Sequence, residues 1–313
     1  MRIIVPPIKS QGIKTKLVPW IQLLVPEVKG RWIEPFFGTG VVAFNSGFQK
    51  ALLNDINPHI IRFYQAIKDR KITPESVREY LERESKLLAE ADDKGYAHFR
   101  FIKDRFNEQH APLDFLFLSR AGFNGMMRFN KKGKWNIPFC QKPERFSKSY
   151  ITKIVNQVNK VACLIQLEWI FTAEPFEQTI LKAGPDDIIY CDPPYIGRYV
   201  DYFSGWNEEN ELRLFGLLSE TPARFILSTW HHNDYRSNPF INSLWNRFNI
   251  ITRDHFYHGG GKIENRKSIV EALVFNYEAN VEKHNAYVQP KAEQMILFEQ
   301  RVEYIEKKLK REF

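Results

Sequence analysis

Short apolar runs that stop at glycine, proline or acidic residues are the clearest pattern in the sequence. Trp32–Glu34 leads into a glycine turn, Ala51–Asn54 stops at Asp55, and Ile188–Cys191 stops at Asp192 and two prolines. Proline cannot donate to a strand ladder, so the last run ends where the prolines begin. Apolar runs of this length bounded by turn residues predict buried strands. Further strands are predicted at residues 163–167, 223–229 and 272–277.

Between the first strands the apolar spacing changes to that of helices. A helix is expected to begin near Val41, after a turn containing Gly38 and Gly40. A second helix is expected after Asp55, because apolar residues recur there at intervals of three and four: Ile60, Ile61, Tyr64 and Ile67. The order strand, glycine turn, helix, strand and acid is typical of a nucleotide-binding β-α-β unit.

Residues 71–150 interrupt this alternation. Charged helical sequence is followed by "LSRAGFNGMMRFNKKGKWNIPFCQKPERF", which is rich in Arg, Lys, Asn and aromatic residues. Within it, "NKKGKWNIP" predicts a hairpin with its turn at Lys132 and Gly133. Strands and helices resume after residue 151. We therefore predict a doubly wound α/β domain formed by residues 1–70 and 151–280, with a mostly helical domain inserted at 71–150.

Residues 281–313 are predicted to form a polar linker and then an amphipathic helix at 291–310. Its apolar residues fall on roughly one side: Met295, Ile296, Phe298, Val302 and Ile305. We expect this helix to pack on its own chain and the protein to act as a monomer.

Composition and charge narrow the class of protein. The 313 residues suffice for one large domain or a core with a smaller insert. Lys and Arg (45) exceed Asp and Glu (37), and the net charge of +8 favours a polyanionic partner. Three widely spaced cysteines, Cys140, Cys163 and Cys191, suggest neither a disulfide framework nor a zinc site. With no signal-peptide layout and no membrane-length apolar run, we expect a cytoplasmic protein.

The glycine turn and Asp55 suggest a nucleotide-like ligand. Gly38 and Gly40 let backbone approach a ligand closely. Asp55, at the end of the next strand, suits the hydroxyls of a ribose, although it would equally cap a helix starting at Asn57 and Pro58. The sequence lacks the lysine of a phosphate-cradling loop, which favours an adenosine compound without a triphosphate, such as one carrying a sulfonium and a carboxylate.

The tetrapeptide Asp192, Pro193, Pro194 and Tyr195 suits activation of an amine. An aromatic exocyclic amine is a poor nucleophile, because its lone pair is delocalised into the ring. Asp192 and the carbonyl of Pro193 are able to accept its two hydrogens while Tyr195 stacks on the base. A base in a duplex would first be flipped out. The structural alternative is that the tetrapeptide only ends a strand.

Two other chemistries are not expected. His231, His232, Asp234 and His258 could suggest a metal cluster, but adjacent histidines on a strand point to opposite faces. Attack by a thiol would need an activated cysteine, and Cys191 lies inside a strand while Cys140 follows "IPF".

Four ordered motifs, "IEPFFGTG", "LLNDIN", "FNGMMRFNKKGKWNIPF" and "DPPY", resemble the Dam-like DNA adenine-N6 methyltransferases of the alpha arrangement. In that family a target recognition domain is inserted between the cofactor half and the DPPY half. The likeness covers most of residues 7–277. It implies the mixed, Rossmann-like sheet of the S-adenosylmethionine-dependent methyltransferases, no metal, and double-stranded DNA as substrate.

The resemblance also implies roles for individual residues. Asp192 to Tyr195 match the catalytic tetrapeptide, and "IKSQGIKTKL" resembles the family's cofactor-binding "KWAGGK" segment, with Ser10 in place of tryptophan and Ile13 in place of a glycine. Relatives often carry an acid before Phe176, where this chain has Pro175. The cofactor-binding residues implied are Lys9, Gly12, Lys14, Glu34, Pro35, Phe36, Gly38, Gly40, Asp55, Phe176 and Asp192.

The basic insert matches the family's DNA-recognition pattern. In this resemblance "STWHHN" takes the place of a strand near the target-base pocket. The segment "GGGKIENRKSIVEALVFNY" resembles the last motif of the family and would bring Arg266 and Lys267 near DNA. Phosphate contacts position a protein, while base-edge contacts specify the site. The DNA-binding residues implied are Arg120, Asn124, Arg128 and Asn130, with Lys131, Lys132 and Lys134 on phosphates.

The leading hypothesis is therefore site-specific methylation of adenine N6 in duplex DNA, within a restriction-modification system of bacterial or phage origin. Cytosine-N4 methylation is the nearest alternative, although cytosine enzymes more often have serine where this chain has Asp192. An RNA or protein amine is a further alternative. A non-catalytic DNA-binding regulator would have no reason to keep the tetrapeptide. A restriction endonuclease sharing the site is the expected functional partner.

Overall fold

The computed structural model describes residues 3–10, 12–91, 93–196, 205–256 and 268–279. The described residues up to Glu278 belong to one compact unit. The predicted C-terminal helix at 291–310 lies outside the described residues, as do His258, Arg266 and Lys267. The domain boundaries placed at residues 70 and 150 stay predictions.

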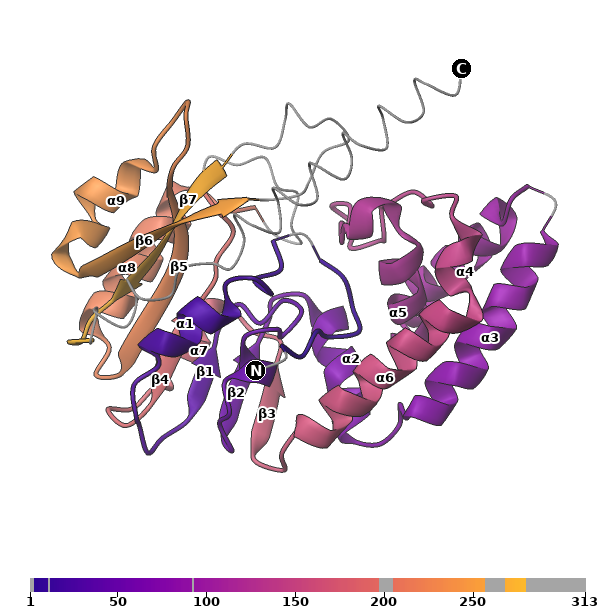
Figure 1. Cartoon of the computed structure of the whole chain (residues 1–313), viewed down its shortest axis with the longest axis horizontal. Helices are drawn as coiled ribbons and strands as arrows, with labels where there is room; N and C mark the ends of the chain where they lie inside the picture. The colour runs from indigo at the N-terminus through magenta and orange to yellow at the C-terminus, as the bar shows by residue number, and fades with distance from the viewer. Residues whose placement is uncertain (1–2, 11, 92, 197–204, 257–267, 280–313) are drawn as a thin grey trace, which may run out of the picture. The chain divides into compact units, whose positions relative to one another are not determined.

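Seven strands of the described chain form one mixed sheet in the order β3-β2-β1-β4-β5-β7-β6 (Figure 1). Strands β3, β2, β1, β4 and β5 pair in parallel, and β7 pairs antiparallel with both β5 and β6, so β7 alone among these seven runs in the opposite direction. The strand order reverses between the adjacent strands β1 and β4, the point at which doubly wound sheets bind ligands beyond their carboxyl ends. The predicted doubly wound α/β sheet is confirmed. The strands are β1 (Trp32–Glu34), β2 (Ala51–Asn54), β3 (Trp169–Thr172), β4 (Ile188–Cys191), β5 (Arg224–His232), β6 (Asn249–Phe256) and β7 (Ser268–Phe275).

Some sequence predictions of elements were wrong. The strand at 163–167 is absent, because Cys163 and Leu164 end the helix α6 (Lys148–Leu164) and the strand begins only at Trp169. The helix near Val41 is a single 3₁₀ turn, η1 (Ala43–Asn45). The Asn45 amide donates to the carbonyl of Val41 at 2.7 Å, and Gly47 follows with a φ of +81°. A glycine in that conformation ends the helix.

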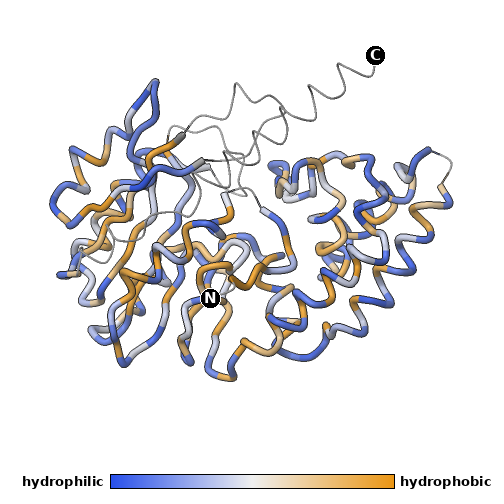
Figure 2. The backbone as a smooth tube through the Cα atoms, in the orientation of Figure 1, coloured by the Kyte–Doolittle hydropathy of each residue, from blue (hydrophilic) through white to orange (hydrophobic). Residues whose placement is uncertain are grey.

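Apolar side chains cover both faces of the sheet. On one face Ile33, Leu52 and Ile189 pack with helices α7 (Phe176–Ile180) and α8 (Glu208–Glu220). On the other, an aromatic cluster joins the strands to α2 (Pro58–Lys68); it contains Phe37, Phe44, Tyr64, Trp169 and Phe171. Each fully buried large side chain contributes about 1.5–3 kcal/mol. In Figure 2 the central strands are mostly hydrophobic, while the outer helix α3 is largely hydrophilic.

The helices α3 (Pro74–Glu90), α4 (Tyr96–Gln109) and α5 (Pro112–Ala121) gather with α6 beside the β3 end of the sheet (Figure 1). Thr73 and Ser76 form a capping box that starts α3. The expected hairpin follows: the Asn130 N–H donates to the Lys134 carbonyl at 2.9 Å, and Gly133 has a φ of +69°. The inserted segment is therefore mostly helical and carries a hairpin, as predicted.

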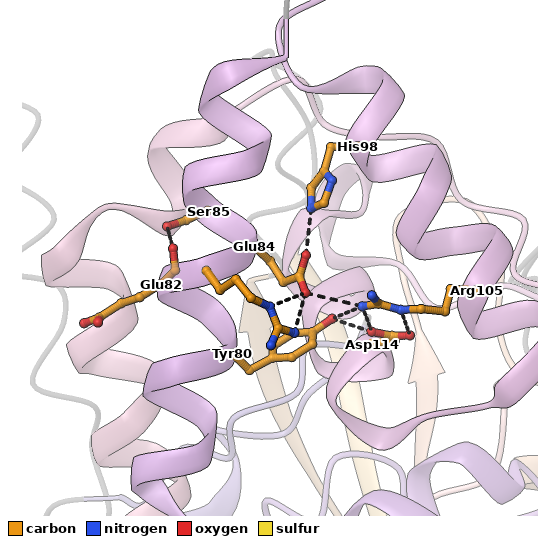
Figure 3. A network of polar contacts seen from close by, with 8 residues as sticks. Tyr80, Glu82, Glu84, Ser85, His98, Arg105 and Asp114 are labelled. Atoms are coloured by element: carbon orange, nitrogen blue, oxygen red, sulfur yellow. Dashed lines mark hydrogen bonds and ion pairs between the residues drawn. The ribbon is translucent and has the colours of Figure 1, made fainter.

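A buried polar network joins three of these helices (Figure 3). Arg105 of α4 donates to Asp114 of α5 through Nε at 2.9 Å, and the Tyr80 hydroxyl of α3 donates to the same carboxylate. Glu84 of α3 lies 3.4 Å from the Arg105 guanidinium and 2.8 Å from His98. Burial alone would raise the pKa of Glu84, but hydrogen bonding from Arg83 and the charges of Arg105 and Arg83 hold it below its ordinary value.

The remaining described helices are short. α1 (Val18–Leu24) precedes β1, and α9 (Pro239–Ser243) follows β5. No helix among the described residues combines the length and the apolar character needed to cross a bilayer.

Candidate active site at the carboxyl edge of β1 and β4

The tetrapeptide lies where β4 ends, next to the end of β1. Cys191 is the last residue of β4, and Asp192 to Tyr195 continue beyond the sheet. The neighbouring strand β1 ends at Glu34 and leads into the glycine turn, while β2 ends one strand further along, beside Asp55. The sheet therefore brings the tetrapeptide and the glycine turn to adjacent strand ends.

Lys14 contacts both polar members of the tetrapeptide. Its ammonium lies 2.8 Å from a carboxylate oxygen of Asp192 and 4.7 Å from the centre of the Tyr195 ring. The Lys14 side chain is only 4% exposed. Burial raises the pKa of Asp192, and the Lys14 charge and hydrogen bond oppose that rise. Lys14 therefore stabilises the ionised form of Asp192, the form that accepts two or more hydrogen bonds.

The tyrosine of the tetrapeptide is held from the antiparallel strands. The Tyr195 hydroxyl donates to the carboxylate of Glu271 on β7. Trp230 of β5 donates its indole N–H to the carbonyl of Ile196 at 3.2 Å. With Ile269, Tyr195 and Trp230 form a small buried cluster apart from the main core. These contacts give the ring of Tyr195 a fixed place beside Asp192.

The glycine turn is tied to Asp55. Gly38 donates its N–H to one carboxylate oxygen of Asp55 at 2.7 Å, and Asn57 donates to the other at 2.8 Å. Burial raises the pKa of Asp55 to about 6, although both N–H donors lower it. The cap of α2 is Asn57, whose side chain accepts from the His59 N–H. The alternative role of Asp55 as the helix cap is thus taken by Asn57.

The two glycines of the turn differ. Gly38 has a φ of +52°, and a Cβ built there would meet nothing within 4 Å. At Gly40, with a φ of +78°, a Cβ would lie 2.4 Å from the Phe37 ring. Gly40 is therefore required for packing of the turn, whereas Gly38 leaves open space beside the end of β1.

Glu34 is enclosed below the glycine turn. Its carboxylate accepts the Trp32 indole N–H at 2.9 Å, and burial raises its pKa well above the usual range. Pro35, next in the chain, accepts the Asn54 side-chain amide through its carbonyl at 3.1 Å. Both residues shape the end of β1 rather than present a charge at its surface.

Aromatic rings line the other side of this end of β1. The ring centres of Phe36 and Phe176 lie 5.2 Å apart, and the ring centre of Trp206 lies 5.5 Å from each of them. The two acids near Pro175 are engaged elsewhere. Glu174 pairs with Lys182 at 2.5 Å, and Glu177 pairs with Arg213 at 2.9 Å.

The structure separates the members of the N-terminal segment. Lys14 lies at the tetrapeptide, and its ammonium also donates a hydrogen bond to the Gly12 carbonyl at 3.3 Å. Gly12 has a φ of +75°. Lys9 instead packs on the insert, where a Cβ at Gly125 would lie 3.2 Å from the Lys9 Cβ. Burial, followed by the charges of Arg120 and Arg145, lowers the pKa of Lys9 to about 8.

Most of the expected DNA-binding residues are accessible in the structure. Asn124, Asn130 and the three lysines of the hairpin are exposed, and Arg128 is half-buried. Arg120 is different. It is 5% exposed and donates to Gln157 of α6, so it does not lie on the surface where the sequence pattern placed it. The reason is that Arg120 lies in the last, buried turn of α5 and its guanidinium bonds to Gln157 instead of facing solvent.

The prediction that His231 and His232 point to opposite faces of their strand was wrong. A register shift between Trp230 and His232 interrupts the alternation of faces on β5, and the rings of His231 and His232 contact each other at 2.8 Å. In the portion that the structure describes, no three His, Cys, Asp or Glu residues are grouped to hold a metal. Burial raises the pKa of the Cys191 thiol well above its usual value, which disfavours a thiolate nucleophile.

A family model for the D12 class of N6 adenine-specific DNA methyltransferases matches residues 10–258. The chain belongs to this family. It is therefore an adenine-specific DNA methyltransferase. The predicted resemblance to the DNA adenine-N6 methyltransferases is confirmed. Enzymes of this class use S-adenosylmethionine as the methyl donor.

Individual relatives agree with the family. The chain is 28% identical to the Type II methyltransferase M1.LlaDCHI of Lactococcus lactis subsp. cremoris over 282 residues, 86% of this chain and 94% of that protein. It is 33% identical to the DNA adenine methylase of Haemophilus influenzae over 196 residues, 61% and 63% of the two chains. It is 27% identical to the Type II methyltransferase M.FokI of Planomicrobium okeanokoites over 283 residues, which cover 87% of this chain and 42% of that protein.

Within this methyltransferase site, sequence reasoning missed Trp230 and Glu271. One signal was present for the second: Glu271 is the single acid in the otherwise apolar strand "SIVEALVF". A lone acid at a buried strand position indicates a polar partner.

Proposed function

We propose that this methyltransferase moves a methyl group from S-adenosylmethionine to the N6 amine of a flipped-out adenine in a short duplex DNA site. The observation that carries the proposal is the Asp192 carboxylate, which lies 2.8 Å from the Lys14 ammonium at the end of β4, next to the glycine turn of β1. A carboxylate acceptor beside a nucleotide-binding turn is the arrangement that activation of a base amine requires.

The residues at the ends of β1 and β2 fit the cofactor. Gly38 leaves open space where a side chain would stand, and each oxygen of Asp55 retains a lone pair for a ribose hydroxyl after accepting one N–H. Phe36 and Phe176 offer apolar rings for the adenine moiety. S-adenosylmethionine would supply a methyl group on a sulfonium, whose sulfur becomes a neutral thioether when the N6 lone pair forms the new bond.

The chain's own residues prepare the amine. Asp192 and the carbonyl of Pro193 accept the two N6 hydrogens, which returns electron density to N6, and the departing proton passes to Asp192 or to water. Tyr195 stacks on the base, and Pro194 stiffens the loop. Lys14 keeps Asp192 able to accept.

The insert supplies the DNA contacts. Lys131, Lys132 and Lys134 surround an exposed hairpin turn, where their ammonium groups reach backbone phosphates. Asn124, Arg128 and Asn130 precede them in the chain and are suited to base edges. Arg120 needs a rearrangement of the insert before it reaches DNA, since it is buried and bonded to Gln157.

The setting proposed is restriction-modification inside the cell. Two of the relatives are named Type II methyltransferases, and a monomeric methyltransferase that protects the site of a cognate endonuclease fits that setting. A solitary methylase is the alternative, which the relative named DNA adenine methylase favours.

The test is methylation of duplex DNA by the purified protein and S-adenosylmethionine, with nucleosides separated after digestion. N6-methyladenine supports the proposal. N4-methylcytosine would move the target to cytosine, and unmodified DNA from protein that binds the cofactor would refute the proposal.

A further inference from the structure

Tyr195 contacts a strand that carries none of the residues predicted for the site. Its hydroxyl donates to the carboxylate of Glu271 on β7. Glu271 is fully buried and stands opposite Trp230 of β5 and Arg253 of β6 in the strand ladders. A buried carboxylate is costly, so its presence in an apolar strand requires compensating contacts. The Tyr195 hydroxyl provides one of them.

A second contact fixes the same loop. Trp230 donates its indole N–H to the Ile196 carbonyl at 3.2 Å, directly after the tetrapeptide. The Trp230 backbone carbonyl accepts the Asn238 amide at 3.0 Å, and Asn238 also donates to Thr229 at 3.2 Å. Asn238 is itself buried. The antiparallel strands thus hold the loop after Asp192 through both a side chain and a backbone carbonyl.

The contacts leave the tyrosine ring little freedom. Two prolines fix the backbone leading to Tyr195, the Lys14 ammonium lies over the ring, and Ile269 and Trp230 pack against it. The bond to Glu271 holds the far end of the ring. A ring that stacks on a base acts on the rate only if it holds the base within reach of Asp192, because small misplacements at a reacting centre cost large factors in rate.

We infer that Glu271 is a positioning residue for methyl transfer, whose carboxylate fixes the Tyr195 ring in the orientation that stacks on the target base. Glu271 does not contact the base and acts through Tyr195. The inference rests on the proposed function. A change at Glu271 is therefore expected to lower kcat and to leave the binding of cofactor and of DNA largely unchanged.

The test uses the full-length protein and two conservative variants. Glu271→Gln keeps the side-chain volume but replaces the charged acceptor with a neutral amide, which breaks the charge-assisted bond from Tyr195, and Tyr195→Phe removes the donor. Each is expected to lower kcat about 10-fold, which corresponds to about 1.4 kcal/mol, while KM for DNA and for S-adenosylmethionine changes less than about two-fold. The double variant is expected to be no slower than the slower single variant, because both changes remove one interaction.

Matched controls lie away from the site. Asp187→Asn alters another buried carboxylate, which accepts from Arg31 at the amino end of β4, and Tyr277→Phe removes a hydroxyl that donates to the Leu24 carbonyl at 2.6 Å. Both are expected to change the melting temperature but not kcat. A purely structural role for Glu271 would behave like these controls, and additive losses in the double variant would also refute the inference.

Two outcomes separate this inference from the proposed function. Wild-type protein that methylates DNA, with Glu271→Gln and Tyr195→Phe equally active, overturns the positioning role alone. Wild-type protein that does not methylate DNA overturns both. If Glu271→Gln fails to fold, Glu271→Asp, which retains the charge but withdraws the acceptor, replaces it and is expected to show the same loss of kcat.

Discussion

The ammonium of Lys14 lies 2.8 Å from the carboxylate of Asp192, and both groups are largely enclosed. One residue comes from the N-terminal segment and the other from the end of β4. The pair has a direct consequence for pH, because burial raises the pKa of Asp192 and Lys14 opposes that rise.

Lys14→Gln should move the acid side of the activity profile to higher pH. Without the cation, the pKa of Asp192 rises further, and the carboxylate proposed to accept the N6 hydrogens becomes protonated as pH falls through that higher value. We expect the acid limb of kcat to shift by at least about one pH unit, equivalent to about 1.4 kcal/mol. The measurement is kcat against pH for both proteins.

Lys68→Gln is the control for this shift. Lys68 ends α2 and donates to the Trp169 carbonyl at 2.5 Å, away from the tetrapeptide. Its variant should keep the wild-type profile. An unshifted acid limb in Lys14→Gln would show that Lys14 does not set the ionisation of Asp192.

Cofactor affinity should depend on the charge of Asp55. Because burial raises its pKa to about 6, the carboxylate is ionised above that pH and protonated below it. If ribose hydroxyls donate to the carboxylate, the dissociation constant of S-adenosylmethionine rises as pH falls through about 6, by up to about 10-fold per unit. Calorimetry from pH 5 to 8 measures it. Asp55→Asn should bind weakly without this dependence, whereas Asp69→Asn, at the other end of α2, should retain it.

The hairpin lysines should determine much of the salt dependence of DNA binding. Replacing Lys131, Lys132 and Lys134 by glutamine removes up to three phosphate contacts, and each contributes about 0.9 to the slope of log affinity against log salt. A change of about two to three in the slope is expected from fluorescence anisotropy. Lys50→Gln, at the amino edge of β2, should leave the slope unaltered. Equal slopes for the two variants would place the DNA on another surface.

The network in Figure 3 should stabilise the insert strongly. Asp114→Ala leaves Arg105 and Tyr80 without their shared acceptor, and breaking a buried ion pair typically costs about 3–5 kcal/mol. Urea denaturation should show a lower free energy of unfolding by about that amount. Asp114→Asn, which keeps an oxygen for Tyr80, should lose less. A loss under about 1 kcal/mol for alanine would contradict a stabilising role.

The sequence predicted those parts of the fold that local chemistry determines. β1, β2 and β4 have the predicted bounds because each is a short buried run that ends at Glu34, Asn54 or Cys191 beside turn residues. The helix expected near Val41 failed because Gly47 and the Asn45 side chain end it within one turn. β6 was missed because "NIITRDHF" mixes polar and apolar residues on an outer strand.

The site was predictable only in part. Motifs located Asp192, Asp55 and Gly38 individually, and the strand order places them at the ends of three consecutive strands, β4, β2 and β1. The pairing of Lys14 with Asp192, and of Tyr195 with Glu271, depends on how distant segments pack. The burial of Arg120 also depends on packing between distant segments, since its guanidinium bonds to Gln157, 37 residues away in the chain.

The most direct test of the central claim compares wild type with Asp192→Ala in cells that lack adenine methylation, by sequencing that maps modified bases. The account predicts N6-methyladenine in one short motif for wild type, and none for the variant, although purified Asp192→Ala still binds DNA. Equal methylation by the variant, or methylation only of cytosine by wild type, would contradict the account.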